Sequence, residues 1–177
     1  MTVTAVDIHK AAWARLTKDA PCGPRPFLFD FRLVNGRPFV HARPQSEPSP
    51  FIHDQHYHLI VRLAPVRRAR IHNKAVERFV GRADFIPWAT DVLARNGLQL
   101  TRVHQIVWED LDLGKPVARR HRPYVLHTAL LSFDAAVVDA TLAAKAWEQG
   151  LGRHRAWGCG TLLVKHKYSV GDLAVAS

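Results

Sequence analysis

Residues 150–160, GLGRHRAWGCG, combine positive charge, an imidazole, an aromatic ring and unusual backbone freedom in one short stretch. Arg153 and Arg155 carry planar guanidinium groups that match the geometry of phosphate oxygens. His154 can face a phosphate, and Trp157 offers a ring on which a base can stack. The glycines allow left-handed backbone and close approach by another backbone, and consecutive amides in such a turn bind anions. Glycines alone would indicate a tight return turn, but with these side chains the stretch favours contact with nucleic acid.

Two more stretches of the chain, residues 67–82 and 119–122, are rich in arginine. The sequence holds 25 Lys and Arg against 15 Asp and Glu, a formal net charge of +10, and a globular protein this basic typically has a polyanionic partner. A surface that is only solvated mixes the two signs more evenly. No basic stretch has a strong amphipathic helix pattern, so nucleic acid is favoured over a membrane. The residues expected to contact the nucleic acid are Arg67, Arg68, Arg70, Lys74, Arg78, Arg119, Arg120, Arg122, Gly150, Gly152, Arg153, His154, Arg155, Trp157 and Gly158.

Potential metal ligands form no recognisable motif. His53, His56 and His58 lie close together in FIHDQHYH, but their spacing matches no standard metal site. They fit better as linker histidines or as supporting contacts to RNA. Cys22 and Cys159 are far apart and form no CxxC pair, which indicates two reduced thiols rather than a disulfide framework or a structural zinc site. We therefore expect no metal and no cofactor.

Length and hydrophobicity set the broad class. With 177 residues, of which 47% are hydrophobic, the chain can bury the core of one ordinary domain or of two small ones. No apolar run approaches the length of a membrane span. The first residues, MTVTAVDIHKAAW, lack the basic-then-apolar layout of a signal peptide. We therefore expect a cytoplasmic protein without a membrane partner.

The elements that must position these residues follow a β-α-β-β-α-β order from residue 57 onward. Apolar patterning predicts strands at 57–65, 98–111, 124–133 and 161–167 and helices at 84–97 and 134–149. Asp84 is a potential cap of the first helix, and Gly150 closes the second. The arginine-rich segment 66–82 is expected to be a loop or hairpin, and 114–123 a basic turn. This order predicts a ferredoxin-like unit, in which both helices cover one face of an antiparallel sheet.

The first 43 residues look like part of a second unit of the same kind. DIHKAAWARLTK at 7–18 predicts a helix, and strands at 27–34 and 37–43 flank an Asn-Gly hairpin signal. The proline- and serine-rich segment 44–50 is the best candidate for a boundary. We therefore predict an α+β protein with tandem ferredoxin-like folds, an abbreviated N-terminal unit with linker at 1–50 and a C-terminal unit at 51–177.

Several of these motifs resemble those of a known family. GLGRHRAWGCGTLLV resembles the C-terminal glycine-rich motif of the CRISPR-associated RAMP proteins, most closely that of the CasE-type endoribonucleases that process CRISPR precursor RNA. Further stretches resemble this family in the same order; they are DIHKAAWARL followed by PFLFDFRL, LIVRLAPVRRAR, and RPYVLHTALLSFDAAVVDATLAAKAWEQGLG.

The resemblance implies metal-independent cleavage of a CRISPR repeat hairpin and retention of the product hairpin in an effector complex with other subunits. His9 matches the histidine of the family's first helix, which the resemblance implies is catalytic, and Lys10 beside it is a candidate phosphate contact. The chain departs from well-known members at Val6, where they carry a tyrosine. Two alternatives therefore stay open. One is a non-catalytic RNA-binding subunit of the same kind of complex, and the other is a basic ferredoxin-like RNA-binding protein unrelated to CRISPR.

Overall fold

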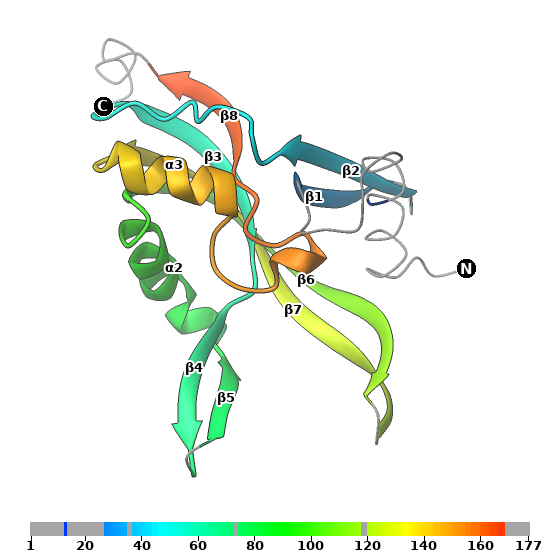
Figure 1. Ribbon diagram of the computed structural model, residues 1–177. Coiled ribbons are helices and arrows are strands. Elements are labelled where there is room, and N and C mark those ends of the chain that lie inside the picture. Colours follow the sequence, from blue (N-terminus) through cyan, green and yellow to red (C-terminus); the bar gives the residue numbers. More distant parts are fainter. Residues whose placement is uncertain (1–12, 14–26, 35–36, 73, 118–119, 169–177) are drawn as a thin grey trace.

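The structure is a computed structural model that describes residues 13, 27–34, 37–72, 74–117 and 120–168 (Figure 1). The helix predicted at 7–18 therefore lies outside the described residues except for Trp13. Within the described part of the chain, no helix has the length and apolar character needed to cross a membrane.

An antiparallel sheet with the strand order β6-β7-β3-β8 forms the centre of the structure. The chain enters these elements in the order β3 (His56–Leu63), α2 (Phe85–Ala94), β6 (Leu98–Val117), β7 (Arg120–Val137), α3 (Ala140–Gln149) and β8 (Leu163–Tyr168). Two helices alternate with the strands, and the first and third strands of this series lie at the middle of the sheet. The predicted β-α-β-β-α-β unit is thereby confirmed.

One face of the sheet is apolar and is covered by the two helices. Alternate residues of β3, from Tyr57 to Leu63, are fully buried and pack with Leu93 of α2 and Trp147 of α3. Successive side chains of a strand point to opposite faces, so this period of two places the main core between sheet and helices. Both helices lie on the same side of the sheet in Figure 1.

The other face of the sheet is partly covered by an N-terminal hairpin. Its strands, β1 (Phe27–Val34) and β2 (Arg37–Pro44), pair as the Asn-Gly signal predicts. Phe27, Phe29 and Phe31 project from β1 into a second buried cluster, which includes Leu111 and Leu126 of the β6–β7 ribbon. This side of the sheet lies away from the helices (Figure 1). The described part of the chain thus has three layers, which are helices, sheet and hairpin.

A buried ion pair joins the hairpin to the sheet. Arg62 of β3 is 1% exposed, and its Nε donates to Asp30 Oδ1 of β1 at 3.0 Å while an Nη donates to the Phe31 carbonyl at 2.7 Å. Arg62 also contacts the carboxylate of Glu109 on β6. Burial alone would lower the pKa of Arg62, but the two carboxylates raise it above its usual value, so the guanidinium stays charged.

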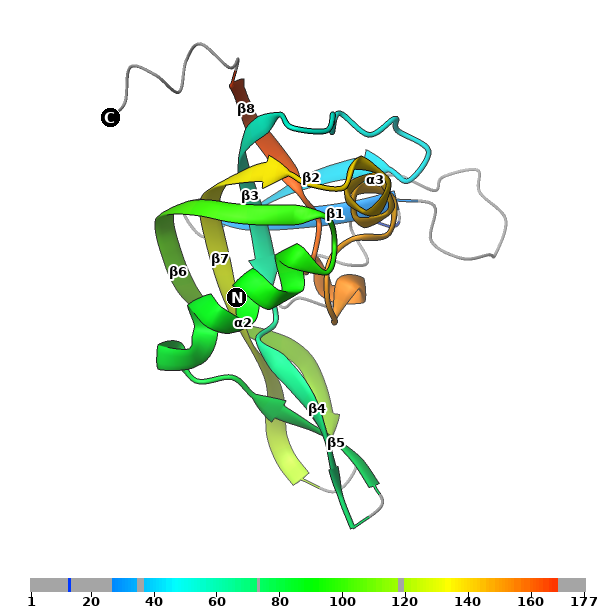
Figure 2. The same ribbon diagram turned by 90° about the vertical axis from the view of Figure 1, so that its left-hand side faces the viewer.

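Two ribbons extend beyond the sheet at the same end. The segment predicted as a loop or hairpin is a hairpin of β4 (Val66–Ile71) and β5 (Lys74–Phe79), and it follows β3 directly. The paired strands β6 and β7, of 20 and 18 residues, also continue past their neighbours. Figure 1 and Figure 2 both show the two ribbons pointing away from β8, and in Figure 1 they diverge from each other.

Three local predictions were wrong. The segment 114–123 was predicted as a basic turn, but most of it belongs to β6 and β7, where Pro116 pairs with Pro123 in an irregular ladder. The helix predicted from Asp134 begins at Ala140, and Asp139 caps it by accepting from the Leu142 amide at 2.9 Å. Asp84 occupies the N-cap position of α2 without a side-chain capping bond.

The pairing of strands explains the two shifted boundaries. Gly and Pro signals favour a turn locally, but the long ladder between β6 and β7 carries both strands through them. The AAVV run after Asp134 fits either a helix or a strand by composition. Its alternate residues Ala135 and Val137 are fully buried opposite Leu100 and Leu98, so sheet packing decides.

Candidate RNA-binding groove

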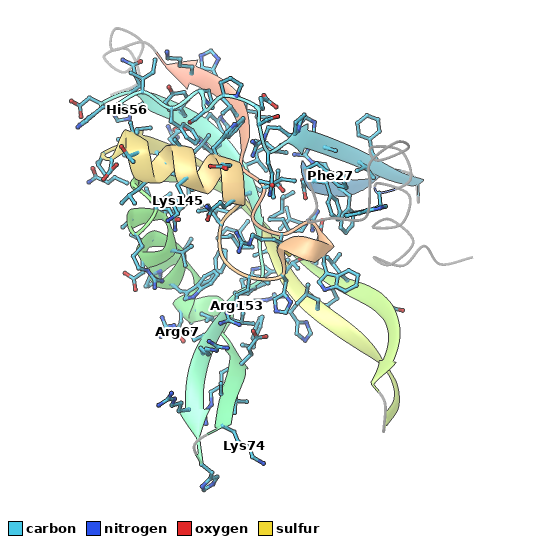
Figure 3. All side chains as sticks on the ribbon, in the orientation of Figure 1. Phe27, His56, Arg67, Lys74, Lys145 and Arg153 are labelled. Atoms are coloured by element: carbon cyan, nitrogen blue, oxygen red, sulfur yellow. The ribbon has the colours of Figure 1, made fainter. Side chains whose placement is uncertain are left out.

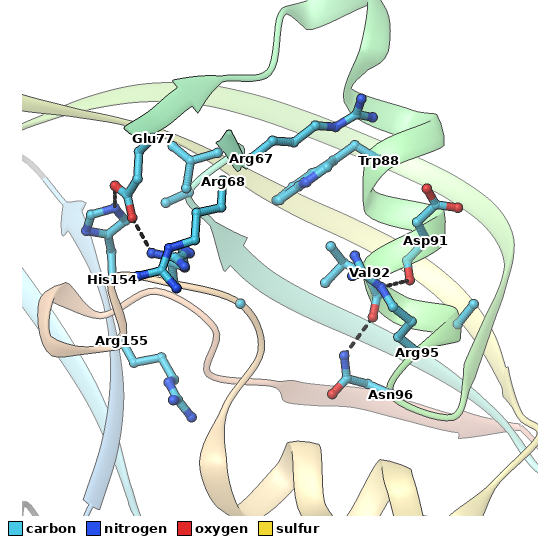
Figure 4. Close-up of a pocket in the computed structure, with 15 residues that line it drawn as sticks. Arg67, Arg68, Glu77, Trp88, Asp91, Val92, Arg95, Asn96, His154 and Arg155 are labelled. Carbon is cyan, nitrogen blue, oxygen red and sulfur yellow. Dashed lines mark hydrogen bonds and ion pairs between the residues drawn. The ribbon is translucent and has the colours of Figure 1, made fainter. Parts of the chain in front are cut away.

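A groove of about 1310 Å³ lies between the β4–β5 hairpin, the C-terminal end of α2 and the glycine-rich stretch 150–160, which we call the glycine loop (Figure 4). The basic side chains lining it come from three separate parts of the sequence; they are Arg67, Arg68, Arg95, Arg153, His154 and Arg155. Only two acidic residues, Glu77 and Asp91, lie among its lining residues. The groove is therefore strongly basic and open, as a phosphate backbone requires.

Glu77 of β5 ties the hairpin to the glycine loop. Its carboxylate forms an ion pair with Arg153 and accepts from His154 Nε2 at 3.2 Å (Figure 4). Partial burial opposes ionisation of Glu77, but the hydrogen bond from Arg153 and the charge of His154 lower its pKa below the usual value. The two sequence segments predicted to bind nucleic acid are thus held against each other by one acidic residue.

The hairpin carries a like-charge pair that the fold alone does not require. Arg67 of β4 lies directly opposite Arg78 of β5 in the ladder, and both side chains are exposed. Like charges facing each other across two strands are destabilising. An anion between the two guanidinium groups would remove this repulsion, so the pair favours a phosphate-binding role for the hairpin. Arg70 and Lys74 are exposed nearer its tip and do not line the groove.

The glycine loop turns tightly, and only some of its glycines lie where a Cβ would clash with the rest of the protein. Gly160 has φ +82°, and a Cβ on it would lie 2.0 Å from the Leu151 carbonyl oxygen. Its amide donates to the Arg62 carbonyl at 2.7 Å, and its carbonyl accepts from the Leu151 amide at 2.7 Å. Gly152, with φ +65°, faces open space on the groove. Gly160 was not among the predicted residues, and its role is to close the loop onto β3.

Several backbone amides of the glycine loop are committed to hydrogen bonds within the fold. The amides of Leu151, Trp157, Gly158 and Gly160 all donate to carbonyls within the protein, and so are not available as an anion nest. Gly158 lets the loop pass close to the rings of Phe29 and Phe31, which lie 3.1 Å from where its Cβ would be.

Trp157, which was predicted to stack on a base of the nucleic acid, does not face the groove. Its ring is half-buried against the second core cluster, and it does not line the groove. Arg155 lines the groove and donates to the Gln149 carbonyl at 2.5 Å, which braces the loop against the end of α3. Gly150 ends that helix with φ +77°, as predicted.

Several predicted residues do not take part in the described groove. His9, Lys10 and Arg119 lie outside the described residues, and Arg120 and Arg122 belong to β7 with side chains that are likewise not described. Glu77, Arg95 and Asn96 line the groove but were not predicted from the sequence. A lone acidic residue between Val76 and Arg78 in a basic hairpin was a usable signal for Glu77, whereas the end of α2 gave none.

Comparisons with known proteins agree with the resemblance found in the motifs. A family model described as CRISPR associated protein matches residues 9–166. No curated protein matches the sequence. Among solved structures, Thermus thermophilus Cse3 bound to an RNA representing a pre-cleavage complex is 20% identical, with a TM-score of 0.66 over 92% of this chain and 89% of that one. Cas6e from Escherichia coli str. K-12 is 16% identical, with a TM-score of 0.69 over 92% of each chain. A chain of a CRISPR RNA-guided surveillance complex is 20% identical, with a TM-score of 0.58 over 91% of this chain and 89% of that one. At these identities the solved structures establish the same fold, which is the tandem ferredoxin-like α+β fold expected above.

Proposed function

The chain belongs to the CRISPR-associated protein family, and we propose that it is an endoribonuclease that cleaves the repeat stem-loops of CRISPR precursor RNA without a metal ion. We propose further that it stays bound to the product hairpin beside the other subunits of an effector complex. Family membership supports this role. So do its structural neighbours, which include a CRISPR endoribonuclease bound to RNA and a chain of an RNA-guided surveillance complex.

The observation that carries the proposal is the basic groove. Arginines of the hairpin, the end of α2 and the glycine loop meet there although they are far apart in sequence. A-form RNA has a deep, narrow major groove, so a stem-loop is recognised mainly by its shape and its phosphates. A protruding hairpin with the facing pair Arg67 and Arg78 beside an open basic groove suits that mode of recognition.

Cleavage without a metal is chemically accessible because RNA carries its own nucleophile. The 2′-hydroxyl attacks the adjacent phosphorus, the P–O5′ bond breaks, and the products are a 2′,3′-cyclic phosphate and a 5′-hydroxyl. A protein accelerates this reaction by aligning the two oxygens, moving protons and stabilising the phosphorane charge. We assign the proton transfer to His9 on the strength of its match to the family motif. Arginine side chains of the groove are suited to stabilising phosphate charge.

The test is single-turnover cleavage of the protein's own repeat RNA with enzyme in excess and EDTA present. His9→Ala should slow cleavage by roughly two to four orders of magnitude, with little change in binding because a neutral histidine adds little to phosphate affinity. An RNA with a 2′-deoxy substitution at the cut site should bind and remain intact. A His9→Ala rate within a few-fold of wild type would remove His9 from the mechanism.

The valine at position 6 favours a second candidate function, that of a non-catalytic RNA-binding subunit. This position carries a tyrosine in well-known CasE members, and valine has no hydroxyl to assist the reaction. Under this alternative the wild-type protein binds the repeat hairpin tightly and leaves it uncut. The same assay separates the two functions, since mapped product ends appear under the first alone.

A further inference from the structure

Three side chains with metal-ligating groups converge on the sheet face opposite the helices. They are His58 of β3, His104 of β6 and Asp134 of β7, and one ligand atom from each lies within 4.8 Å of the other two. No other group of three His, Cys, Asp or Glu residues in the described part of the chain meets in this way. The three strands are neighbours in the sheet, so the cluster is built on rigid elements rather than on loops.

The register of the sheet produces this convergence. His58 lies directly opposite Asp134 in the β3–β7 ladder, where side chains share a face. On β6 the register shifts between Val103 and Gln105, and His104 is the residue at that irregularity. Bulges of this kind re-aim a side chain and are often found beside functional sites. The sequence spacing of the three residues gives no hint of the cluster because each comes from a different strand.

Distances within the cluster suit a shared ion. His104 Nε2 lies 2.8 Å from Asp134 Oδ2, and His58 Nδ1 lies 4.0 Å from Asp134 Oδ1. The two imidazole rings stack with centroids 4.5 Å apart and an angle of 21° between their planes. Ligands of a tetrahedral zinc ion lie about 3.3 Å apart at bond lengths near 2.0 Å. The three ligand atoms all lie within 4.8 Å of one another, so modest side-chain rotations would bring them to this separation.

A partner outside the ligand set orients one imidazole. His58 Nε2 lies 2.8 Å from Ser132 Oγ, which leaves Nδ1 directed toward Asp134. Histidines that bind metals commonly engage their second ring nitrogen in a hydrogen bond, which fixes the tautomer and the ring orientation. His166 of β8 lies opposite His58 in the next ladder, so a third imidazole lies on the same face.

We propose that His58, His104 and Asp134 form a binding site for a divalent transition-metal ion, with Zn²⁺ as the best match. Two imidazole nitrogens and one carboxylate are a ligand set that Zn²⁺ accepts, and solvent or His166 fills the remaining position. The three side chains are between 17% and 27% exposed, so an ion can enter from solvent. Bound there, the ion links β6, β7 and β3 at one end of the sheet.

The site is separate from the proposed RNA groove. His56, two residues before His58, begins β3 at the end of the sheet near β8, whereas Lys74 lies at the far tip of the β4–β5 hairpin (Figure 3). None of the three ligands lines the groove. The inference thus goes beyond the proposed function, and metal binding and RNA cleavage can succeed or fail independently.

The experiment is a titration of the full chain, free of any affinity tag and stripped with EDTA, using Co²⁺ as a spectroscopic probe and Zn²⁺ as competitor. Wild-type protein should bind one equivalent of Co²⁺ with visible d–d absorption that Zn²⁺ abolishes. His104→Ala and Asp134→Asn should each weaken binding by more than about 100-fold, and Ser132→Ala by about 10- to 100-fold. Zn²⁺ should raise the Tm of wild type but of neither ligand variant.

His127→Ala is the matched control. His127 pairs with Asp110 on the same β6–β7 ribbon at 2.7 Å, but this exposed pair belongs to no group of three ligands. Its loss should leave Co²⁺ affinity unchanged. Circular dichroism in EDTA establishes that each variant folds, and His104→Gln replaces His104→Ala if the latter does not. Absence of stoichiometric binding, or equal affinity in wild type and both ligand variants, would overturn the site. RNA cleavage measured in EDTA reports on the proposed function alone.

Discussion

Arg62 Nε donates to Asp30 Oδ1 at 3.0 Å in a contact that solvent does not reach, since the two residues are 1% and 2% exposed. The pair joins the N-terminal hairpin to the central strand of the sheet. Removing Asp30 takes away the more buried of the two carboxylates on Arg62 and leaves only that of Glu109. Because breaking a buried pair outright costs about 3–5 kcal/mol, Asp30→Ala should lower the free energy of unfolding in urea denaturation by up to that amount.

The control for this substitution is an exposed pair. Asp110 and His127 are 67% and 53% exposed, and such pairs contribute between about 0 and 1 kcal/mol. Asp110→Ala should change the free energy of unfolding by no more than that. Equal effects of the two substitutions would mean that the hairpin docks on the sheet through its aromatic residues and not through Asp30.

The basic hairpin should account for much of the RNA affinity. Replacing Arg67, Arg68 and Arg70 together with alanine should weaken binding of a repeat stem-loop and reduce the slope of log affinity against log salt by about 2 to 3. A matched triple of exposed cations elsewhere, Arg102, Lys145 and Lys167, should have a much smaller effect. The test is to measure the RNA affinity of both triple variants across a salt series. Equal losses of affinity in the two variants would show that the hairpin is not part of the RNA interface.

The glycine loop should tolerate a side chain at one glycine and not at another. Gly160→Ala places a Cβ 2.0 Å from the Leu151 carbonyl oxygen, so the loop must move away from β3. Gly152→Ala meets no atom within 4 Å and suffers only from its positive φ, a cost of about 1–2 kcal/mol. Urea denaturation should show the larger loss of stability for Gly160→Ala. The reverse order would contradict the packing described for the loop.

The link through Glu77 should depend on pH. Because its folded pKa is below the ordinary value of 4.5, this carboxylate contributes stability above about pH 4.5. The contribution is lost as the pH falls through the lowered pKa. Wild type should therefore have a higher Tm than Glu77→Gln at pH 7, and the difference should shrink at pH values below 4. A pH-independent difference would mean that the carboxylate charge does not hold the loop.

Cys159 should be chemically inert in the folded protein. Its side chain is 1% exposed, and burial raises the pKa of the thiol to about 12. At pH 8 it should not react with a thiol reagent, because the thiolate is the nucleophile. Cys22→Ser isolates Cys159 for this test, with the same variant in denaturant as the positive control. Rapid labelling of the folded variant would show that the glycine loop opens readily.

The elements that sequence patterns located best were those with a clear period. The β3 strand, with alternate buried residues, and the strands β1 and β2 of the N-terminal hairpin match their predicted ranges within a residue or two. Boundaries failed where composition suited two structures, as in the AAVV run before α3, and where a long ladder overrode Gly and Pro signals near Pro116. Local sequence does not reveal such pairings, because the residues that determine them lie on another strand, far away in the sequence.

The candidate groove was predictable in its parts but not in its assembly. Arginine clusters identified the hairpin, and glycines beside Arg153 identified the loop. The position of Glu77 in a basic hairpin marked it as unusual, but nothing in the sequence identified Arg153 and His154 as its partners. Nor did the sequence indicate that Trp157 would pack against the second core cluster. The cluster of His58, His104 and Asp134 was hidden for the same reason, since strand register alone brings those residues together.

The pairing of β3 with β8 also fixes when this protein can finish folding on the ribosome. β3 is complete at residue 63, but its edge partner begins only at residue 163. At ordinary elongation rates of about 5–20 residues per second, this edge waits roughly 5 to 20 s during synthesis. The glycine loop, which closes on the Arg62 carbonyl, is translated just before β8. A stalled nascent chain would therefore expose an unpaired strand edge to aggregation and would lack the glycine-loop side of the groove.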